Sequence, residues 1–175
     1  DISYITTSYV VESWEALRKV TNYGEEAGVL LFTKLFELEP EAKALFGFQE
    51  CTPLDELRKS RKFVNHASLF VHMFDKAVEM IGPDTDMLTD ILLDLGEKHV
   101  AYGVRPEYFP SMGTALMHSM KAVLGKDEFT TPVEQAWHEL FSAMSYDMIR
   151  GQRRAKDIKK RRISNQYQTS TDVHS

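Results

Sequence analysis

The sequence predicts an all-α protein of a single domain, and three observations agree on this. Apolar residues recur every three or four positions along most of the chain, which is the spacing of one face of a helix. The 9 glycines and 6 prolines are few, and the prolines fall where helices would start. No convincing alternation of apolar and polar residues indicates a strand. With 175 residues, the chain is long enough to bury one hydrophobic core.

The first two helices are predicted from start signals that precede an apolar stripe. Residues 1–7 are expected to form a frayed lead, with Ser8 as the candidate N-cap of the first helix. Asn22 and Glu25 have the spacing of a capping box, which would open a second helix that ends near Pro40.

A third, long helix is expected from about residue 53 to 81. Thr52-Pro53-Leu54-Asp55 combines a hydroxyl cap, a proline at the first position and an acid in the first turn. Gly82-Pro83-Asp84 should end this helix, and a shorter helix follows that ends at Gly103.

Two more helices complete the predicted fold. Pro106 is well placed in the first turn of a helix that stops at Gly125. Thr131-Pro132-Val133-Glu134 is a capping box that opens the last helix. The main domain is therefore expected over residues 8–151.

Charge divides the chain into an acidic body and a basic tail. Residues 1–149 have 13 Lys/Arg against 24 Asp/Glu, a net charge of −11, whereas residues 150–175 have 8 against 2, a net charge of +6. Residues 152–175 are expected to continue the last helix outward and to be disordered from residue 165. A basic run of this kind can contact an acidic partner or anionic lipid, and no strong signal for nucleic acid is present.

Cysteine content and hydropathy indicate a cytoplasmic protein. Cys51 is the only cysteine, so an internal disulfide is excluded and a reducing compartment fits. No apolar run approaches the roughly 18 residues of a membrane span, and no signal-peptide core is present. Because the chain begins with Asp, we expect a processed product or a segment of a longer polypeptide.

His66 and His99 are the candidate metal-ligating residues. His99 continues the apolar stripe of the helix that ends at Gly103, and His66 lies at the edge of the apolar face of the long helix. A single histidine in such a place is more often a core residue bonded to a carbonyl. Two imidazoles that face each other among apolar side chains, however, suit a flat iron macrocycle. Without a Cys-x-x-Cys-His motif, the group would be non-covalent haem b, iron protoporphyrin IX.

The other histidines are interpreted as surface or packing residues. His72 lies about 240° from His66 around the helix and cannot face the same pocket. His118 and His138 are interpreted as helix-surface residues.

The motifs together resemble the globin family over roughly residues 8–150. Residues 31–40 and the following Phe46 resemble the second helix, its closing proline and the haem-stacking phenylalanine of globins. The resemblance implies a globin fold of about 7–8 helices around a haem pocket.

The same resemblance implies the residues on both sides of the haem. On the distal side, Phe32 and Phe46 would line the pocket, His66 would be the distal histidine, and Phe70 would be the bulky residue one turn on. Residues of the proximal side are matched in the same way: His99 as the iron ligand, Leu95 as the acceptor for its other ring N–H, and Val104 and Phe109 as apolar contacts.

Two groups of globins share features with this chain. The segment from His99 to Phe109 and the later Trp137 resemble the globin half of flavohaemoglobins, but those proteins have tyrosine where this chain has Phe109, and Tyr108 is one position off. No Gly-rich phosphate loop or reductase-length segment is present. A histidine at position 66 is more similar to neuroglobin and cytoglobin, in which the distal histidine can itself bind iron.

The register of the long helix leaves one alternative, in which Asn65 takes the distal position and Leu69 lies one turn on. We favour His66 because it puts Ala67 at the helix crossing and turns Phe63 inward, whereas the alternative turns Lys62 toward the core.

We therefore expect a haem-b globin that reversibly binds O2 or another diatomic ligand such as CO or NO. His66 would hydrogen-bond the ligand or compete with it for the iron held by His99. Two alternatives use the same pocket. One is nitric-oxide dioxygenation or nitrite reduction with an external reductase, and the other is gas or redox sensing within a longer protein.

Overall fold

The computed structural model describes residues 2–82 and 84–172, which form seven α-helices and one 3-10 helix and contain no β-strand. The predicted all-α class and number of helices are confirmed. None of the described helices is long and apolar enough to cross a membrane. In chain order the elements are α1 (Tyr4–Arg18), α2 (Tyr23–Leu38), η1 (Pro40–Phe46), α3 (Leu54–Leu57), α4 (Arg61–Met80), α5 (Thr85–Ala101), α6 (Tyr108–Leu124) and α7 (Thr131–Asp172).

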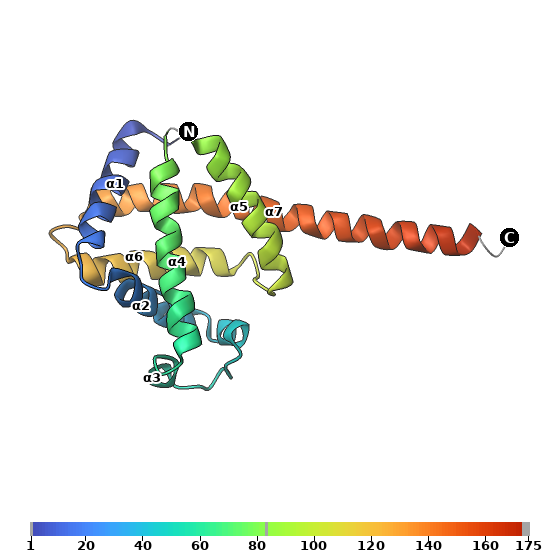
Figure 1. The fold of residues 1–175 in the computed structure, drawn as a ribbon, viewed down its shortest axis with the longest axis horizontal. Helices are drawn as coiled ribbons and strands as arrows, with labels where there is room; N and C mark the ends of the chain where they lie inside the picture. The colour runs from blue at the N-terminus through green and yellow to red at the C-terminus, as the bar shows by residue number, and fades with distance from the viewer. Residues whose placement is uncertain (1, 83, 173–175) are drawn as a thin grey trace.

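The helices pack in crossed pairs around one hydrophobic core. Helix α2 packs on α4 and α6, whereas α5 and α1 both pack on α7. Trp14 and Trp137 lie at the centre with ring centroids 5.5 Å apart, and both side chains are fully buried. Figure 1 shows that α7 passes behind this packed body and continues far beyond it as a single helix.

The first helix begins earlier than predicted. Ser3, not Ser8, caps α1, because its side chain accepts a hydrogen bond from the Thr6 backbone N–H at 3.1 Å. The Ser8 hydroxyl donates to the Tyr4 carbonyl inside the helix instead. Thr6 also donates to Glu139 of α7 at 2.7 Å, so described residues of the expected frayed lead are part of the fold.

The starts of the next helices also differ from the prediction. Asn22 adopts a left-handed conformation (φ 59°) and its side chain makes no capping bond to α2. The long helix predicted from residue 53 is two helices, α3 and α4, because the Ser60 hydroxyl caps a new start by accepting from the Phe63 N–H at 3.3 Å. Helix α6 begins at Tyr108, two residues after Pro106.

The predicted stops are in place, and the last helix is longer than expected. Gly82, Gly103 and Gly125 all have positive φ at the ends of helices, where glycine is favoured. Helix α7 continues to Asp172, so the disorder predicted from residue 165 is wrong for residues 165–172. Asp1, Pro83 and residues 173–175 lie outside the described residues.

Glycines allow α5 and α7 to approach backbone to backbone. A Cβ at Gly96 would lie 2.0 Å from the Met148 carbonyl oxygen, and a Cβ at Gly151 would lie 2.1 Å from the Leu93 carbonyl oxygen. Because both neighbours are main-chain atoms, neither can move aside without moving its helix. The two glycines therefore fix how closely these helices pack.

We predict that Gly96→Ala destabilises the protein. Alanine should favour an isolated helix by about 1 kcal/mol, but here it must push α5 away from α7, and overpacking of this kind costs about 1–3 kcal/mol or more. We expect a net loss of about 1–2 kcal/mol in the free energy of unfolding, measured by urea denaturation. The matched control, Asp90→Ala on the exposed face of α5, should change it by less than about 0.5 kcal/mol. Equal free energies of unfolding for wild type and Gly96→Ala would show that α5 and α7 leave room for a Cβ at this position.

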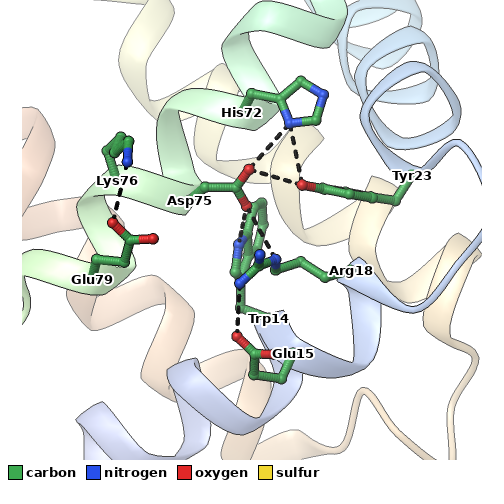
Figure 2. A network of polar contacts seen from close by, with 8 residues as sticks. All are labelled: Trp14, Glu15, Arg18, Tyr23, His72, Asp75, Lys76 and Glu79. Carbon is green, nitrogen blue, oxygen red and sulfur yellow. Dashed lines mark hydrogen bonds and ion pairs between the residues drawn. The ribbon is translucent and has the colours of Figure 1, made fainter.

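A polar network around Asp75 joins α1, α2 and α4 (Figure 2). Asp75 lies nine residues after His66, about 180° around α4. One carboxylate oxygen accepts from the Trp14 indole N–H at 2.8 Å, and the other accepts from the Tyr23 hydroxyl at 2.8 Å and lies 3.1 Å from His72 Nδ1. The Arg18 guanidinium lies 3.8 Å from the carboxylate. Burial tends to raise the pKa of Asp75, but the bonds from Tyr23, His72 and Trp14 and the charge of Arg18 outweigh it and lower the pKa.

We predict that Asp75→Asn weakens the protein and reduces its acid sensitivity. Because the pKa of Asp75 is lower in the folded chain than its unfolded value of about 3.9, its stabilising effect is complete above that value and is lost as the pH falls further. At pH 7 the variant should lose about 1–3 kcal/mol of unfolding free energy, and the difference from wild type should shrink near pH 3.

Glu79→Gln is the control, because it removes one exposed carboxylate from the same helix, where Glu79 pairs only with Lys76 (Figure 2). Urea unfolding at both pH values gives the comparison. A loss in Asp75→Asn that stayed the same at both pH values would contradict the role of the Asp75 charge.

Candidate functional site

The four predicted distal residues lie together as one aromatic group. Phe32 of α2 is in ring contact with Phe46, Phe70 and His66, at centroid distances of 5.3, 5.4 and 5.8 Å. Phe46 at the end of η1 lies 5.0 Å from the His66 ring, nearly edge to face. Three elements therefore meet at His66, an exposed residue of α4 whose imidazole is partly covered by two flanking aromatic rings.

The packing of α4 supports His66 over Asn65 at this position. Ala67 is fully buried, and a Cβ at Gly28 of α2 would lie 2.4 Å from the Ala67 carbonyl oxygen. Phe63 is buried in the core, whereas Asn65 and Lys62 are both exposed. The crossing of α2 and α4 therefore has the rotation that turns His66, rather than Asn65, toward the aromatic group.

His99 lies in the last turn of α5 and is oriented by its own helix. Its Nδ1 lies 2.7 Å from the Leu95 carbonyl oxygen, the hydrogen bond predicted from the sequence. A carbonyl can only accept, so Nδ1 donates, and in the neutral ring Nε2 has the free lone pair. Burial lowers the pKa of His99, although the bond to Leu95 opposes this shift. The imidazole is therefore neutral at pH 7 and presents one available nitrogen.

His66 and His99 are close enough to interact electrostatically. Burial lowers the pKa of His66, and the neighbouring His99 lowers it further. Both rings are thus neutral at pH 7, and each can offer a nitrogen to a metal between α4 and α5. This pair of neutral imidazoles beside the Phe32, Phe46 and Phe70 rings fits an iron macrocycle that supplies its own equatorial ligands.

The corner after His99 is held by the last helix. Gly103 turns the chain with φ 80°, and the Val104 N–H donates to the His99 carbonyl at 3.1 Å. The Val104 carbonyl accepts from the Gln152 side-chain amide of α7 at 2.8 Å, and Gln152 is 1% exposed. Gln152 was missed in the sequence because it stands at the start of the basic tail. Its position four residues after Met148 on the buried side of α7 was the available signal.

The same corner is tied to the α2–η1 junction. The Arg105 guanidinium pairs with Glu41 and donates to the Tyr108 hydroxyl at 2.9 Å. Tyr108 belongs to the main hydrophobic cluster, whereas Phe109 is buried outside it. Polar contacts from Arg105 therefore help to position the residues predicted as proximal apolar contacts.

His72, His118 and His138 are where the sequence interpretation put them. His118 and His138 are exposed on α6 and α7. His72 packs against α2, where it lies 3.2 Å from the Tyr23 hydroxyl and where a Cβ at Gly24 would be 2.5 Å from its ring. Cys51 is an exposed free cysteine.

Sequence comparison connects this arrangement to known proteins. A family model described as Globin matches residues 29–148. Neuroglobin of Dissostichus mawsoni is 36% identical over 142 residues, which are 79% of this chain and 85% of that protein. Neuroglobin of Danio rerio is 36% identical over 143 residues, which are 80% of this chain and 86% of that protein.

Solved structures of a haem protein and of a globin are similar to this chain. A hexacoordinated haem protein from an anhydrobiotic tardigrade matches with a TM-score of 0.76 and 26% identity, covering 86% of this chain and 95% of that chain. A Drosophila melanogaster globin matches with a TM-score of 0.70 and 18% identity, covering 84% of this chain and 93% of that chain. At 18% identity, the second likeness concerns the fold alone.

Proposed function

The chain belongs to the globin family, and from this premise we propose that it is a haem-b globin in which His99 is the proximal iron ligand and His66 the distal histidine. Membership of the family implies that the chain binds haem and a diatomic gas. We propose in addition which residues bind the iron, that the haem is haem b, and which gases bind. The observation that carries it is the bond from His99 to the Leu95 carbonyl, beside a second neutral histidine. When bound, haem would supply an iron atom to which a histidine nitrogen and a gas could bind.

The role of His99 follows from its tautomer. With the Nδ1 proton held by Leu95, Nε2 can donate its lone pair to iron without first losing a proton. The hydrogen bond also prevents rotation of the ring, so the lone pair keeps one direction. Leu95, Val104 and Phe109 would form the apolar surroundings on this side.

The role of His66 has two forms that use the same neutral ring. One nitrogen can donate a hydrogen bond to O2 or NO, which favours polar ligands over CO. Alternatively, the unprotonated nitrogen can itself bind iron, so that every external ligand competes with an internal one. Two observations favour internal competition. Partial burial and the neighbouring His99 lower the pKa of His66, which keeps a nitrogen lone pair free at pH 7, and the similar tardigrade protein is described as hexacoordinated.

Replacement of His99 tests the proximal assignment. His99→Ala should abolish stoichiometric haem binding, or collapse the Soret band, in a titration of haem followed by absorbance, because the residue that donates to iron is lost. The control is His118→Ala on the exposed face of α6, which should bind haem as the wild type does. An unchanged ferrous spectrum in His99→Ala would rule out His99 as the ligand.

Replacement of His66 tests the internal competition. The ligand-free ferrous wild type should have a six-coordinate spectrum in part, and His66→Leu should convert it to five-coordinate. CO binding should become about tenfold faster if the internal ligand occupies about nine-tenths of the wild-type molecules. Flash photolysis or stopped-flow mixing with CO measures this rate.

His138→Leu, a change at an exposed histidine of α7, provides the comparison and should leave spectrum and rate unchanged. A wild-type ferrous protein that is wholly five-coordinate would refute internal competition. It would leave hydrogen bonding to the gas as the role of His66.

A further inference from the structure

A groove lined by arginines lies where α7 leaves the packed body. Its volume is about 390 Å³, and it is bounded by Leu93 of α5 and one side of α7. The lining residues of α7 are Arg150, Arg153, Arg154, Asp157, Ile158 and Arg161. Four guanidinium groups therefore face one space that contains a single carboxylate.

The four arginines share one face of the helix. At 100° per residue, Arg150, Arg153, Arg154 and Arg161 fall within an arc of about 100°, and they extend over about 16 Å of helix length. Their alignment with a groove distinguishes this face from the opposite face of α7, where Lys159 and Arg162 point away from the groove lining.

Two of these arginines already have acidic partners and two do not. Arg150 pairs with Asp147 at 2.9 Å, and Arg154 pairs with Glu97 and lies 3.7 Å from Asp94, both on α5. Arg153 and Arg161, in contrast, make no ion pair within the described ranges 2–82 and 84–172. The guanidinium groups of Arg153 and Arg161 are therefore available to a ligand, on a helix whose base is fixed to the body by Arg154.

We propose that this groove is a binding site for a soluble anion with several phosphate groups. The planar fork of arginine matches the oxygens of a phosphate and can bond them in pairs, which a lysine cannot do. Arg153 and Arg161 are about 12 Å apart along the helix, a span that an elongated polyphosphate matches better than a single phosphate does. All four arginines are exposed, so binding needs little desolvation of the protein and should weaken with added salt.

A lipid headgroup has the same phosphate chemistry, but the shape of the helix favours the soluble anion. A helix that lies on a bilayer needs an apolar stripe along one side. The exposed apolar residues do not form one stripe along this segment. Ile158 lies in the groove, whereas Ile163 and Tyr167 lie about 140° and 180° away from it around the helix.

The test measures binding of sodium tripolyphosphate to the full haem-loaded chain by isothermal titration calorimetry. We expect saturable binding that weakens at least tenfold in Arg153→Gln/Arg161→Gln, since charge-assisted bonds from two guanidinium groups are removed. The matched control, Lys159→Gln/Arg162→Gln, removes the same charge from the opposite face and should weaken binding by less than about threefold. Circular dichroism and haem absorbance should be unchanged in both variants.

Four results would overturn the proposal. The first is that wild type gives no saturable binding to tripolyphosphate. The second is that the control variant loses as much affinity as Arg153→Gln/Arg161→Gln, which would mean general attraction to a basic helix. The third is that phosphatidylcholine vesicles with phosphatidylinositol bisphosphate bind in an arginine-dependent way while tripolyphosphate does not, which would make the site a membrane contact. A glutamate-rich peptide that binds as well as tripolyphosphate would also exclude phosphate selectivity.

Discussion

The close packing of α5 on α7 is the contact on which most of the candidate site depends. Gly96 meets the Met148 carbonyl and Gly151 meets the Leu93 carbonyl, so the helices approach at a distance that no side chain would allow. His99 follows Gly96 by three residues, and Gln152 directly follows Gly151. The same approach therefore sets the height of His99 and brings the Gln152 amide within 2.8 Å of the Val104 carbonyl, just beyond it. The spacing of α5 and α7 and the position of the corner after His99 are two consequences of one backbone contact.

The position of His66 depends on the rotation of α4 about its axis. Contacts on two opposite faces of this helix fix that rotation. His66 and Asp75 are nine residues apart, about 180° around the helix. On the His66 side the rings of Phe32 and Phe46 set the rotation, and on the other side Asp75 bonds to Trp14 and Tyr23 from different helices (Figure 2). A turn of one residue that put Asn65 in the place of His66 would carry Asp75 to the exposed position of Lys76 and break its bonds to Trp14 and Tyr23. The buried polar network is thus a second reason why His66, and not Asn65, faces the aromatic group.

Much of the fold and of the candidate site could be predicted from the sequence. The features that could not be predicted have one physical cause in common. Helical spacing predicted the buried faces, Gly103 and Gly125 predicted stops, and the place of Ala67 predicted the rotation of α4. Helix starts were less predictable because hydroxyl residues occur before and after the true cap. What favours Ser3 over Ser8 includes a bond between Thr6 and Glu139, 133 residues apart. Gln152 is a similar case, since its acceptor lies 48 residues earlier in the chain. Local patterns contain no information on such distant partners.

Helix α7 is helical both inside the packed body and beyond it in solvent. Its charges affect the stability of the outer part, which lies beyond the apolar packing of the body. Inside the body, burial of an apolar face stabilises the helix, whereas beyond Arg154 that contribution ends. There, like charges three and four residues apart repel and each such pair weakens the helix slightly. Asp157 offsets part of this, because its neighbours at three and four residues on both sides are all basic: Arg153, Arg154, Lys160 and Arg161. An anion held by the arginine face would offset more of the repulsion. Helical order in this segment and anion binding would then stabilise each other, as linkage requires of any ligand that binds one conformation preferentially.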